Sequence, residues 1–379
     1  MRALRVIVVG GGIGGMAAAI ALHRRGHDVQ VWERAAAVGE VGSGLTLWPN
    51  GLRALDAIGV GAQVRSRAMA ETEGGIRDRS GRWLTRTDTE KVADRYGPVV
   101  AVHRADLFDI LCTALGEDRL RLGVTVTGVD IEDPPVRVLH AGGAETADLV
   151  IGADGLRSVV RTAVCPHARP PRYAGYTAWR MITEPLPGLR QGGQIWGSGE
   201  IFGIVPLADQ RVYMFGAVNA AEGERAPDGE FAEVRRRFGA WPDPVPRLLG
   251  AVSPDSVMRH DIYHLPDLPT FVRGRVALLG DAAHAMTPNM GQGANLALED
   301  AVTLAALLDN GEIDDALRRY DARRRPRTRA LAHRSRRIGT VAQWSWTPAV
   351  RARDTALRLM PGWAMPRAFA RALDWTPPA

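Results

Sequence analysis

The chain has 379 residues, of which 46% are hydrophobic and 24% charged, as is typical of a soluble globular enzyme with one large or two closely packed domains. Every apolar stretch is much shorter than the roughly 20 residues that a membrane-spanning helix needs, which argues against integral membrane association. The formal net charge is +6, but no nucleic-acid-binding motif accompanies the basic residues, so we expect no nucleic-acid partner.

The start of the chain resembles a signal peptide, because Arg2 and Arg5 precede the apolar run of residues 6–9. Glycines follow this run where a cleavage site would stand, so we interpret the run as a buried strand and the protein as cytoplasmic. Only two cysteines are present, Cys112 and Cys165, and no spacing typical of a metal site accompanies them. We therefore expect two free thiols, no disulfide and no metal.

A strand, a helix and a second strand are predicted near the start of the chain. Residues 5–9 form an apolar run, residues 14–25 have helical character and end in basic residues before Gly26, and residues 29–33 form a second strand. Such a strand–helix–strand unit is the building block of a parallel sheet.

The segment Gly-Gly-Gly-Ile-Gly-Gly at residues 10–15 contains the pattern G-x-G-x-x-G between the first strand and the helix. Gly10 permits the tight turn, Gly12 lets the backbone approach a pyrophosphate, and Gly15 allows close packing of helix and strand. Glu33 ends the second strand and can hydrogen-bond to a ribose 2′-hydroxyl, which favours FAD or NAD over NADP. The segment therefore predicts a dinucleotide site rather than an ordinary glycine-rich turn.

The middle of the chain alternates between elements of different kinds. Short strands and turns are expected over residues 74–100, a helix over about 104–115, and a buried strand at 149–151. Residues 173–218 are rich in aromatic and β-branched residues and predict an antiparallel sheet. Within that sheet, residues 197–199 (Gly-Ser-Gly) predict a hairpin turn, so we find no second dinucleotide fingerprint.

Towards its C-terminal end the chain returns to the pattern of the first residues. A loop is expected at Pro242, Pro244 and Pro246, then a buried strand at residues 275–279 and a helix at 291–308. From residue 314 onward the chain is expected to be mostly helical. We interpret its densest basic run, Arg318 to Arg337, as a solvated helix face that can also attract phosphate-bearing cofactors.

Three further segments resemble the signatures of one family. Residues 152–158 resemble the "DG" motif of the class A flavoprotein monooxygenases, the para-hydroxybenzoate hydroxylase family, and residues 279–284 resemble their "GD" motif. Residues 288–295 are similar to the family's P-x-x-G-Q-G-x-N segment. Smaller matches lie at residues 44–50 and 103–107. The order and spacing agree over essentially the whole chain.

The resemblance implies an α/β fold with a Rossmann-type, glutathione-reductase-like FAD domain, an inserted antiparallel β-sheet substrate domain and C-terminal helices. We expect the FAD domain to comprise residues 1–73, 98–172 and 266–325, the substrate domain 74–97 and 173–265, and the helical segment 326–379. The chain resembles the compact branch of the family that lacks a C-terminal thioredoxin-like domain.

The resemblance also implies which residues bind FAD non-covalently. Asp281 follows a strand and can accept hydrogen bonds from ribityl hydroxyls, and the N–H groups at the start of the 291–308 helix would point at the isoalloxazine. Arg104 would contact the cofactor, and Asp154 would serve both FAD and NAD(P)H. The expected FAD-binding residues are Gly10, Gly12, Ile13, Gly14, Gly15, Glu33, Arg34, Gly44, Leu45, Arg104, Asp154, Gly280, Asp281, Pro288, Gly291, Gly293, Ala294 and Asn295.

The activity implied is that of an NAD(P)H-consuming monooxygenase. NADPH or NADH would bind transiently as a co-substrate, and one atom of O2 would pass through a flavin C4a-hydroperoxide to an aromatic or polycyclic small molecule. Gly42, Gly44, Gly291 and Gly293 would border the flavin ring and leave room for it to move. We expect a monomer or a homodimer.

Substrate contacts are expected from the β-rich segment and the flavin loop. Arg180, Tyr213 and Pro288 are candidates for substrate positioning rather than for acid–base roles. The apolar segment 201–205 favours a neutral aromatic or polycyclic substrate. The pocket residues proposed are Trp48, Trp179, Phe202, Ile204, Phe215 and Met290, although about half of the aromatic residues on these strands would be plain core.

Three alternatives stay open. A flavin halogenase is suggested by residues 344–348 (Trp-Ser-Trp-Thr-Pro), but this segment follows the GD motif, and Lys91, the only lysine, is in unsuitable surroundings. A flavin-dependent epoxidase or reductase of an isoprenoid-like substrate shares the first glycine motif. A non-catalytic flavin-binding sensor would carry the same FAD motifs.

Overall fold

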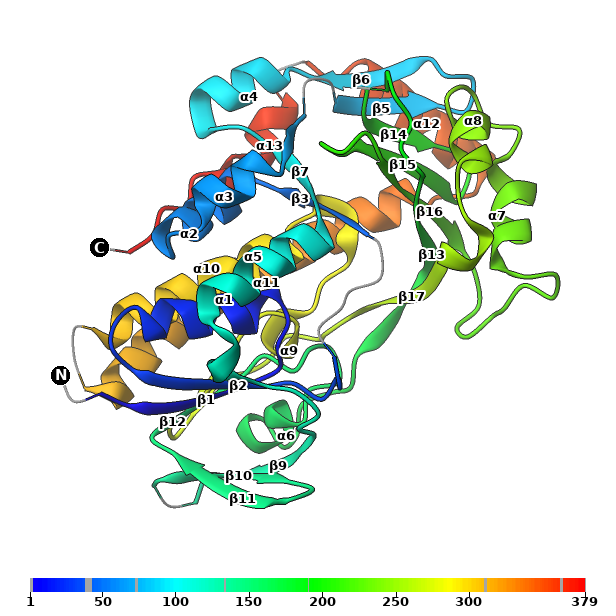
Figure 1. The fold of residues 1–379 in the computed structure, drawn as a ribbon. Helices are drawn as coiled ribbons and strands as arrows, with labels where there is room; N and C mark the ends of the chain where they lie inside the picture. The colour runs from blue at the N-terminus through cyan, green and yellow to red at the C-terminus, as the bar shows by residue number, and fades with distance from the viewer. Residues whose placement is uncertain are drawn as a thin grey trace.

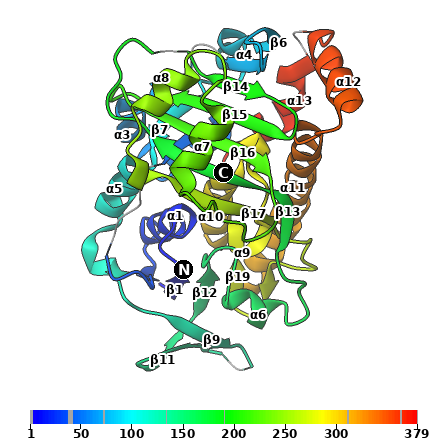
Figure 2. The ribbon, with the colours of Figure 1, turned by 90° about the vertical axis from the view of Figure 1, so that its right-hand side faces the viewer.

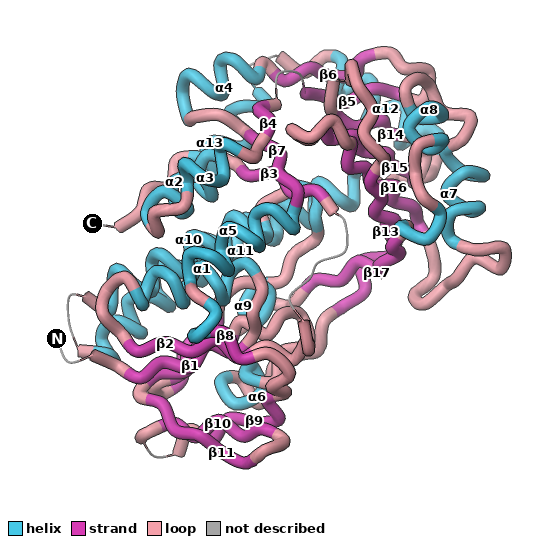
Figure 3. The backbone as a smooth tube through the Cα atoms, in the orientation of Figure 1, coloured by secondary structure: helices cyan, strands magenta, loops and turns pink. Residues whose placement is uncertain are grey.

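The computed structural model describes residues 3–37, 43–71, 74–132, 134–189, 191–309, 312–361 and 364–378. Two large sheets dominate it: a mostly parallel sheet near the N-terminus and a mostly antiparallel sheet beside it (Figure 1). Long helices lie between the two sheets. The backbone tube in Figure 3 therefore shows a layer of strands, a layer of helices and a second layer of strands. The expected α/β fold class is confirmed.

The first sheet has six strands in the order β18-β19-β12-β1-β2-β8, and all of its neighbours are parallel except the β18–β19 pair. Its central strands are buried on both faces, which explains their continuous apolar sequences. The strands are β1 (Arg5–Val9), β2 (Asp28–Trp32), β8 (Leu120–Arg121), β12 (Leu149–Gly152), β18 (Val272–Arg273) and β19 (Val276–Leu278).

Helices cover one face of this sheet and a small antiparallel sheet covers the other (Figure 1). Every residue from Ile13 to Leu22 is buried, because helix α1 is enclosed between the sheet and its neighbouring helices. The helices are α1 (Ile13–His23), α5 (Arg104–Leu115), α10 (Gly293–Leu308) and α11 (Ile313–Ala342). The small sheet consists of β9 (Val126–Asp130), β10 (Val136–His140) and β11 (Gly143–Ala147), next to α6 (Val160–Val164).

The second sheet has seven strands in the order β17-β13-β16-β15-β14-β5-β6. The expectation of an antiparallel sheet holds for all neighbours except β14 and β5, which are parallel because β5 joins from an earlier part of the chain. The expected hairpin turn at residues 197–199 joins β14 to β15. The strands are β5 (Gly74–Asp78), β6 (Trp83–Thr87), β13 (Arg172–Ile182), β14 (Gly193–Trp196), β15 (Glu200–Pro206), β16 (Val212–Asn219) and β17 (Met258–His264).

The two faces of the second sheet have different neighbours. Helices α7 (Glu230–Phe238) and α8 (Val245–Gly250) cover the outer face and enclose an apolar cluster with Phe202 at its centre. Figure 2 looks onto the outer face, with α7 and α8 in front, and Figure 1 shows that the inner face is turned towards the helices of the first domain. Strand alternation places Phe215 on this inner face.

A third, three-stranded sheet connects the two halves and is surrounded by helices from distant parts of the chain. Its strands are β3 (Gly44–Leu47), β7 (Val100–His103) and β4 (Met69–Ala70). The helices nearby in sequence or space are α2 (Pro49–Ala57), α3 (Gly61–Ser66), α4 (Thr89–Tyr96) and α13 (Ala364–Leu373), while α12 (Thr347–Arg358) packs on β6.

Two sequence-based expectations were wrong in detail, and one small sheet was not anticipated. Helix α4 occupies part of the 74–100 segment, which was expected to hold only strands and turns; Asp88 caps it by accepting from the Lys91 N–H group. Helix α8 begins at Val245, inside the expected proline loop, because proline is tolerated in a first helical turn. The β9–β11 sheet was not anticipated, since its residues carry a weak apolar pattern.

A buried charge network joins α10 to α11 behind the first sheet. Arg324 donates to Glu299 and Asp300 at 2.6 Å each, and Arg327 also donates to Glu299. His284 lies 2.5 Å from Asp300. Burial disfavours ionisation of Asp300, but His284 and Arg324 hold its pKa below the ordinary value. The Asp300 carboxylate is therefore charged, and the fold depends on the cations that face it.

We predict that Arg324→Met costs about 3–5 kcal/mol of unfolding free energy, because it leaves two buried carboxylates without their shared cation. Urea unfolding of the apoprotein measures this. Arg323→Met, one residue away but exposed, is the matched control and should change stability by less than about 0.5 kcal/mol. Equal stability of the two variants would contradict the role assigned to the network.

Candidate active site

The glycines of the 10–15 loop perform different tasks. Gly10 has φ +106°, and a Cβ atom there would lie 2.4 Å from the carbonyl oxygen of Ala153. A Cβ on Gly15 would lie 2.0 Å from the carbonyl oxygen of Gly10, and one on Gly14 would lie 2.8 Å from Leu279 Cδ1. A Cβ on Gly12 would meet nothing within 4 Å. Gly12 therefore faces open space, which a pyrophosphate can occupy.

Helix α1 begins directly behind this open space. No side chain caps its N-terminus, and no acidic residue lies in its first turn. Its free N–H groups and partial positive charge are therefore available to an anionic ligand. Ile13 is buried at the start of the helix, and its contact with the cofactor stays a prediction.

Glu33 holds the loop in place. Its carboxylate accepts from the Gly11 N–H group at 2.8 Å and from the Ala35 N–H group at 2.9 Å. Its contact with a ribose stays a prediction. Arg34 follows it and is exposed to solvent.

Asp281 lies just after the end of β19, at the carboxyl end of the first sheet's central strands. Gly280 turns the chain with φ +57° and ψ −140°, and its N–H group donates to the buried Asp300 carboxylate at 3.0 Å. Asp281 itself is exposed, and no hydrogen bond or ion pair engages its carboxylate within the described residues. The turn thus presents an unused acceptor to the solvent side, as binding of ribityl hydroxyls requires.

The segment from Pro288 to Asn295 forms a turn and the start of α10. Gly291 adopts a left-handed conformation with φ +60°, and a Cβ on Gly293 would meet nothing within 4 Å. Pro288 is exposed, and Ala294 is partly buried against the main core. No side chain caps α10 and no acid lies in its first turn, so this second helix N-terminus can also face a ligand.

Asn295 is a clamp rather than a surface residue. It is fully buried, accepts from the Trp48 N–H group at 3.0 Å, and donates to the carbonyl oxygens of Thr46 and Gly291 at 3.2 and 2.8 Å. A Cβ on Gly51 would lie 2.0 Å from its side-chain oxygen, so α2 must approach closely here. Asn295 therefore connects β3 to the turn at Gly291.

Asp154 caps helix α6. Its carboxylate accepts from the Ser158 hydroxyl at 2.5 Å and from the N–H groups of Val159 and Val160 at 2.7 and 3.1 Å. Contacts with FAD and NAD(P)H stay a prediction for this residue.

The structure brings together the polar substrate candidates on the inner face of the second sheet. Arg180 is paired with Phe215 across β13 and β16, and Tyr213 lies two residues before Phe215 on the same face. A Cβ on Gly44 would lie 2.5 Å from Tyr213 Cβ, so this ring packs directly on β3 beside Leu45. Burial raises the pKa of the Tyr213 phenol, although Arg180 and Arg104 oppose the shift. The phenol is therefore protonated near neutral pH and can donate a hydrogen bond.

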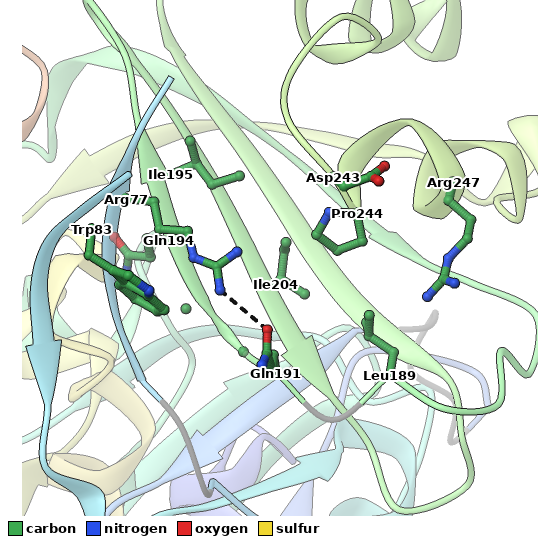
Figure 4. Close-up of a pocket in the computed structure, with 12 residues that line it drawn as sticks. Arg77, Trp83, Leu189, Gln191, Gln194, Ile195, Ile204, Asp243, Pro244 and Arg247 are labelled. Carbon is green, nitrogen blue, oxygen red and sulfur yellow. Dashed lines mark hydrogen bonds between the residues drawn. The ribbon is translucent and has the colours of Figure 1, made fainter. Parts of the chain in front are cut away.

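Three proposed pocket residues lie elsewhere. Trp179, Phe202 and Ile204 belong to the apolar cluster beneath α7 and α8, on the outer face. Ile204 also forms part of the floor of a cavity of about 300 Å³ between Trp83 and Arg247, shown in Figure 4. Because side chains alternate along β15 and β16, Phe202 and Ile204 lie on one face of the sheet and Phe215 lies on the other.

The C-terminal helices contribute contacts that the sequence did not reveal. Phe369 of α13 stacks on Trp48 with ring centroids 5.2 Å apart and an interplanar angle of 7°. Met290 is buried in a cluster that includes Phe369, and Asn289 donates to the Tyr176 hydroxyl at 2.9 Å. Contacts between residues this far apart in the chain have no local sequence signal.

The remaining titratable groups support structural roles. His284 is buried and hydrogen-bonded to Asp300. Cys112 and Cys165 are free. Within the described residues no group of three or more His, Cys, Asp or Glu side chains could hold a metal ion, and no helix is long and apolar enough to cross a membrane.

Comparison with known proteins decides the family. A family model described as "FAD binding domain" matches residues 3–335. The chain belongs to this FAD-binding family. It is 36% identical to aurachin C monooxygenase/isomerase of Stigmatella aurantiaca over 99% of both chains. It is also 36% identical to 3-amino-4-hydroxybenzoate 2-monooxygenase of Streptomyces cremeus, covering 94% of this chain and 92% of the relative.

A solved structure agrees with this assignment. The crystal structure of Klebsiella pneumoniae HpxO complexed with FAD and uric acid matches with a TM-score of 0.90 and 31% identity, covering 97% of this chain and 96% of that one. The resemblance to class A flavoprotein monooxygenases is thereby confirmed, and the protein is a flavin-dependent oxidoreductase that uses FAD.

The residues present fit FAD. Two helix N-termini without caps, the open space at Gly12 and the unengaged carboxylate of Asp281 match the anionic and hydroxyl-rich parts of the cofactor. Gly42 was also expected to border the flavin, but it lies outside the described residues.

We predict that Gly12→Val abolishes FAD binding without unfolding the chain. The new side chain points into space that the protein leaves open, and Gly12 has an ordinary φ of −71°. Gly15→Ala is the contrasting variant, because its methyl group would collide with the Gly10 carbonyl and lower the thermal stability of the apoprotein. A folded Gly12→Val protein that keeps its yellow flavin would refute this reading of the loop.

We also predict that Asp281→Ala weakens FAD binding by roughly 1.5–3 kcal/mol, the contribution of charge-assisted hydrogen bonds, with the fold unchanged. Titration of apoprotein with FAD, followed by flavin fluorescence, gives the dissociation constant. Asp228→Ala, an exposed acid in a distant loop, is the control. An unchanged constant for Asp281→Ala would remove this carboxylate from the cofactor site.

Proposed function

We propose that the protein is an NAD(P)H-consuming monooxygenase that transfers one atom of O2 to an aromatic or polycyclic small molecule. The observation that carries the proposal is the inner face of the second sheet. There Arg180, Tyr213 and Phe215 lie on neighbouring strands, and Tyr213 packs directly on Gly44 of β3. The relatives named above act on aromatic compounds, which supports the same substrate class.

The chain's own residues would bind and orient. Bound FAD supplies the redox chemistry that NAD(P)H and O2 require. Phe215 offers an apolar surface to an aromatic ring, the protonated Tyr213 hydroxyl can donate to a substrate oxygen, and the Arg180 guanidinium can stabilise developing negative charge. Pro288, exposed at the start of the flavin loop, would limit how closely the substrate approaches.

The co-substrate is proposed to bind without a dinucleotide fingerprint of its own. The only G-x-G-x-x-G segment that joins a strand to a helix is the loop at residues 10–15. NAD(P)H would therefore bind transiently near the flavin, and the acceptor groups of Asp154 lie close to that loop because β12 pairs with β1. We also propose the three-part division into FAD-binding domain, substrate domain and C-terminal segment, and a cytoplasmic enzyme that acts as monomer or homodimer.

The activity is tested with isotopic oxygen. Compounds that accelerate NAD(P)H oxidation by the FAD-loaded protein are identified first, and the product formed under ¹⁸O2 is then weighed by mass spectrometry. One ¹⁸O atom in the product supports the monooxygenase. NAD(P)H oxidation that yields a reduced or unlabelled product would favour the isoprenoid reductase alternative instead.

We predict that substrate accelerates flavin reduction, because NAD(P)H must meet a flavin position that a bound substrate stabilises. A ligand can favour that position only by binding it more tightly than the other. Anaerobic stopped-flow reduction, with and without a productive compound, measures the effect. Equal rates in both would show that reduction is not controlled by substrate.

A further inference from the structure

The large hydrophobic side chains that are most exposed lie in one short part of the chain. Trp344 is 38% exposed, Trp346 is 72% exposed and Leu359 is 77% exposed, and these three are the only exposed large hydrophobics of the described residues. The two tryptophans lie in the link between α11 and α12, and Leu359 follows the end of α12. The two tryptophans belong to the Trp-Ser-Trp-Thr-Pro segment at residues 344–348, to which the proposed activity gives no role.

The same part of the chain carries the positive charge. Residues 326–379 contain ten arginines against only Asp354 and Asp374, a formal charge of +8, whereas the whole chain carries +6. The remainder of the protein is therefore slightly acidic. Arg327, Arg329 and Arg358 pair with Glu299, Asp267 and Asp78 of that remainder, so part of this charge is neutralised. The positive charge that is left still favours attraction of an anionic surface to the C-terminal helices.

Exposed arginines flank the exposed apolar residues. Arg337 lies two helical turns before Trp344, and Arg351 lies in the second turn of α12 after Trp346. No ion pair joins Arg337 or Arg351 to a carboxylate in the part of the chain that the structure describes. We call Arg337, Trp344, Trp346, Arg351 and Leu359 the C-terminal patch.

Hydrogen bonds and an ion pair hold helix α12 of the C-terminal patch to the rest of the protein. The buried Arg353 guanidinium donates to the carbonyl oxygens of Ala342 and Gly197, each at 2.9 Å, and packs over the ring of Trp196. Arg358 pairs with Asp78 of the second sheet. Helix α12 is thus fixed to the sheet on one side, while its other side lies at the periphery of the molecule (Figure 2).

We propose that the C-terminal patch is a docking surface for the headgroup region of an anionic membrane leaflet. Tryptophan is the side chain that favours this region most, and unpaired arginines add attraction for acidic lipids. A second copy of this chain is the poorer occupant, because a two-fold interface would place Arg337 and Arg351 opposite like charges. Of the densest basic run, only Arg337 belongs to the C-terminal patch.

Vesicle flotation tests the proposal with the full-length, FAD-loaded protein. Vesicles of phosphatidylcholine alone are compared with vesicles of equal parts phosphatidylcholine and phosphatidylglycerol. We expect binding to the anionic vesicles only, and loss of binding at about 0.5 M salt, where exposed charges are screened. Equal binding to both vesicle types, or to neither, would overturn the proposal.

Two double variants locate the surface. Arg337→Gln with Arg351→Gln should lower the partition coefficient roughly 30-fold, and Trp346→Ser with Leu359→Ser should lower it at least about tenfold. Neither pair is assigned to cofactor or substrate binding, so FAD content and NAD(P)H oxidation serve as checks of folding.

A charge-matched control comes from the other end of α11. Arg318→Gln with Arg319→Gln removes the same charge about 30 Å or more away from the patch, given 1.5 Å of rise per helical residue, and should leave binding unchanged. If this control weakens binding as much as the patch variants do, vesicle binding depends on net charge alone, and the C-terminal patch is not the docking surface. A dimer in light scattering that Trp346→Ser with Leu359→Ser converts to monomer would assign the patch to a second copy instead.

Discussion

One buried carboxylate, that of Asp300, holds the cofactor half of the molecule together. Its oxygens accept from the Gly280 N–H group, from Arg324 of α11 and from the His284 ring, so a strand end, a helix and a short turn meet at a single residue of α10. The turn at Gly280 has a backbone conformation that only glycine adopts easily, and Asp300 fixes it from behind. The exposed position of Asp281 follows from that arrangement.

The electrostatics of the site come mainly from the backbone. Helices α1 and α10 pack against each other and both begin without a side-chain cap or an acid in the first turn. Missing side-chain caps alone do not mark a ligand site, because α2, α5, α7 and α11 lack them too. A Cβ on Gly12 or Gly293 would meet nothing within 4 Å, so the N-termini of α1 and α10 face open space in which a ligand can supply the acceptors. An elongated dianionic dinucleotide with an electron-accepting ring meets that requirement at two separate points.

Local elements of this fold were predictable, and long-range contacts were not. The strand–helix–strand unit around Gly10–Gly15, the helix at Arg104–Leu115 and the hairpin at residues 197–199 follow from patterns of a few residues, and the structure has all three. Alternation along β15 and β16 separated Phe202 from Phe215 correctly, yet only tertiary packing decides which face meets the cofactor.

Two site residues illustrate the same limit. The family motif marks Asn295, but its role as a clamp between Trp48 and Gly291 depends on the placement of α2, which no local pattern reports. The stacking of Phe369 on Trp48 joins residues more than 300 positions apart and left no trace in the sequence. Motifs therefore predicted the cofactor loops, while the contacts around Trp48 required the structure.

The position of α13 has a consequence for how the enzyme is made. Its last carbonyl groups accept from Arg53 and Arg327, and its Phe369 covers Trp48 beside the flavin loop. Ribosomes synthesise residues 364–373 after every other described element of the site. The nascent chain therefore contains the 10–15 loop and the Asp281 turn before it contains α13. A flavin captured during translation would therefore meet Trp48 before Phe369 has covered it.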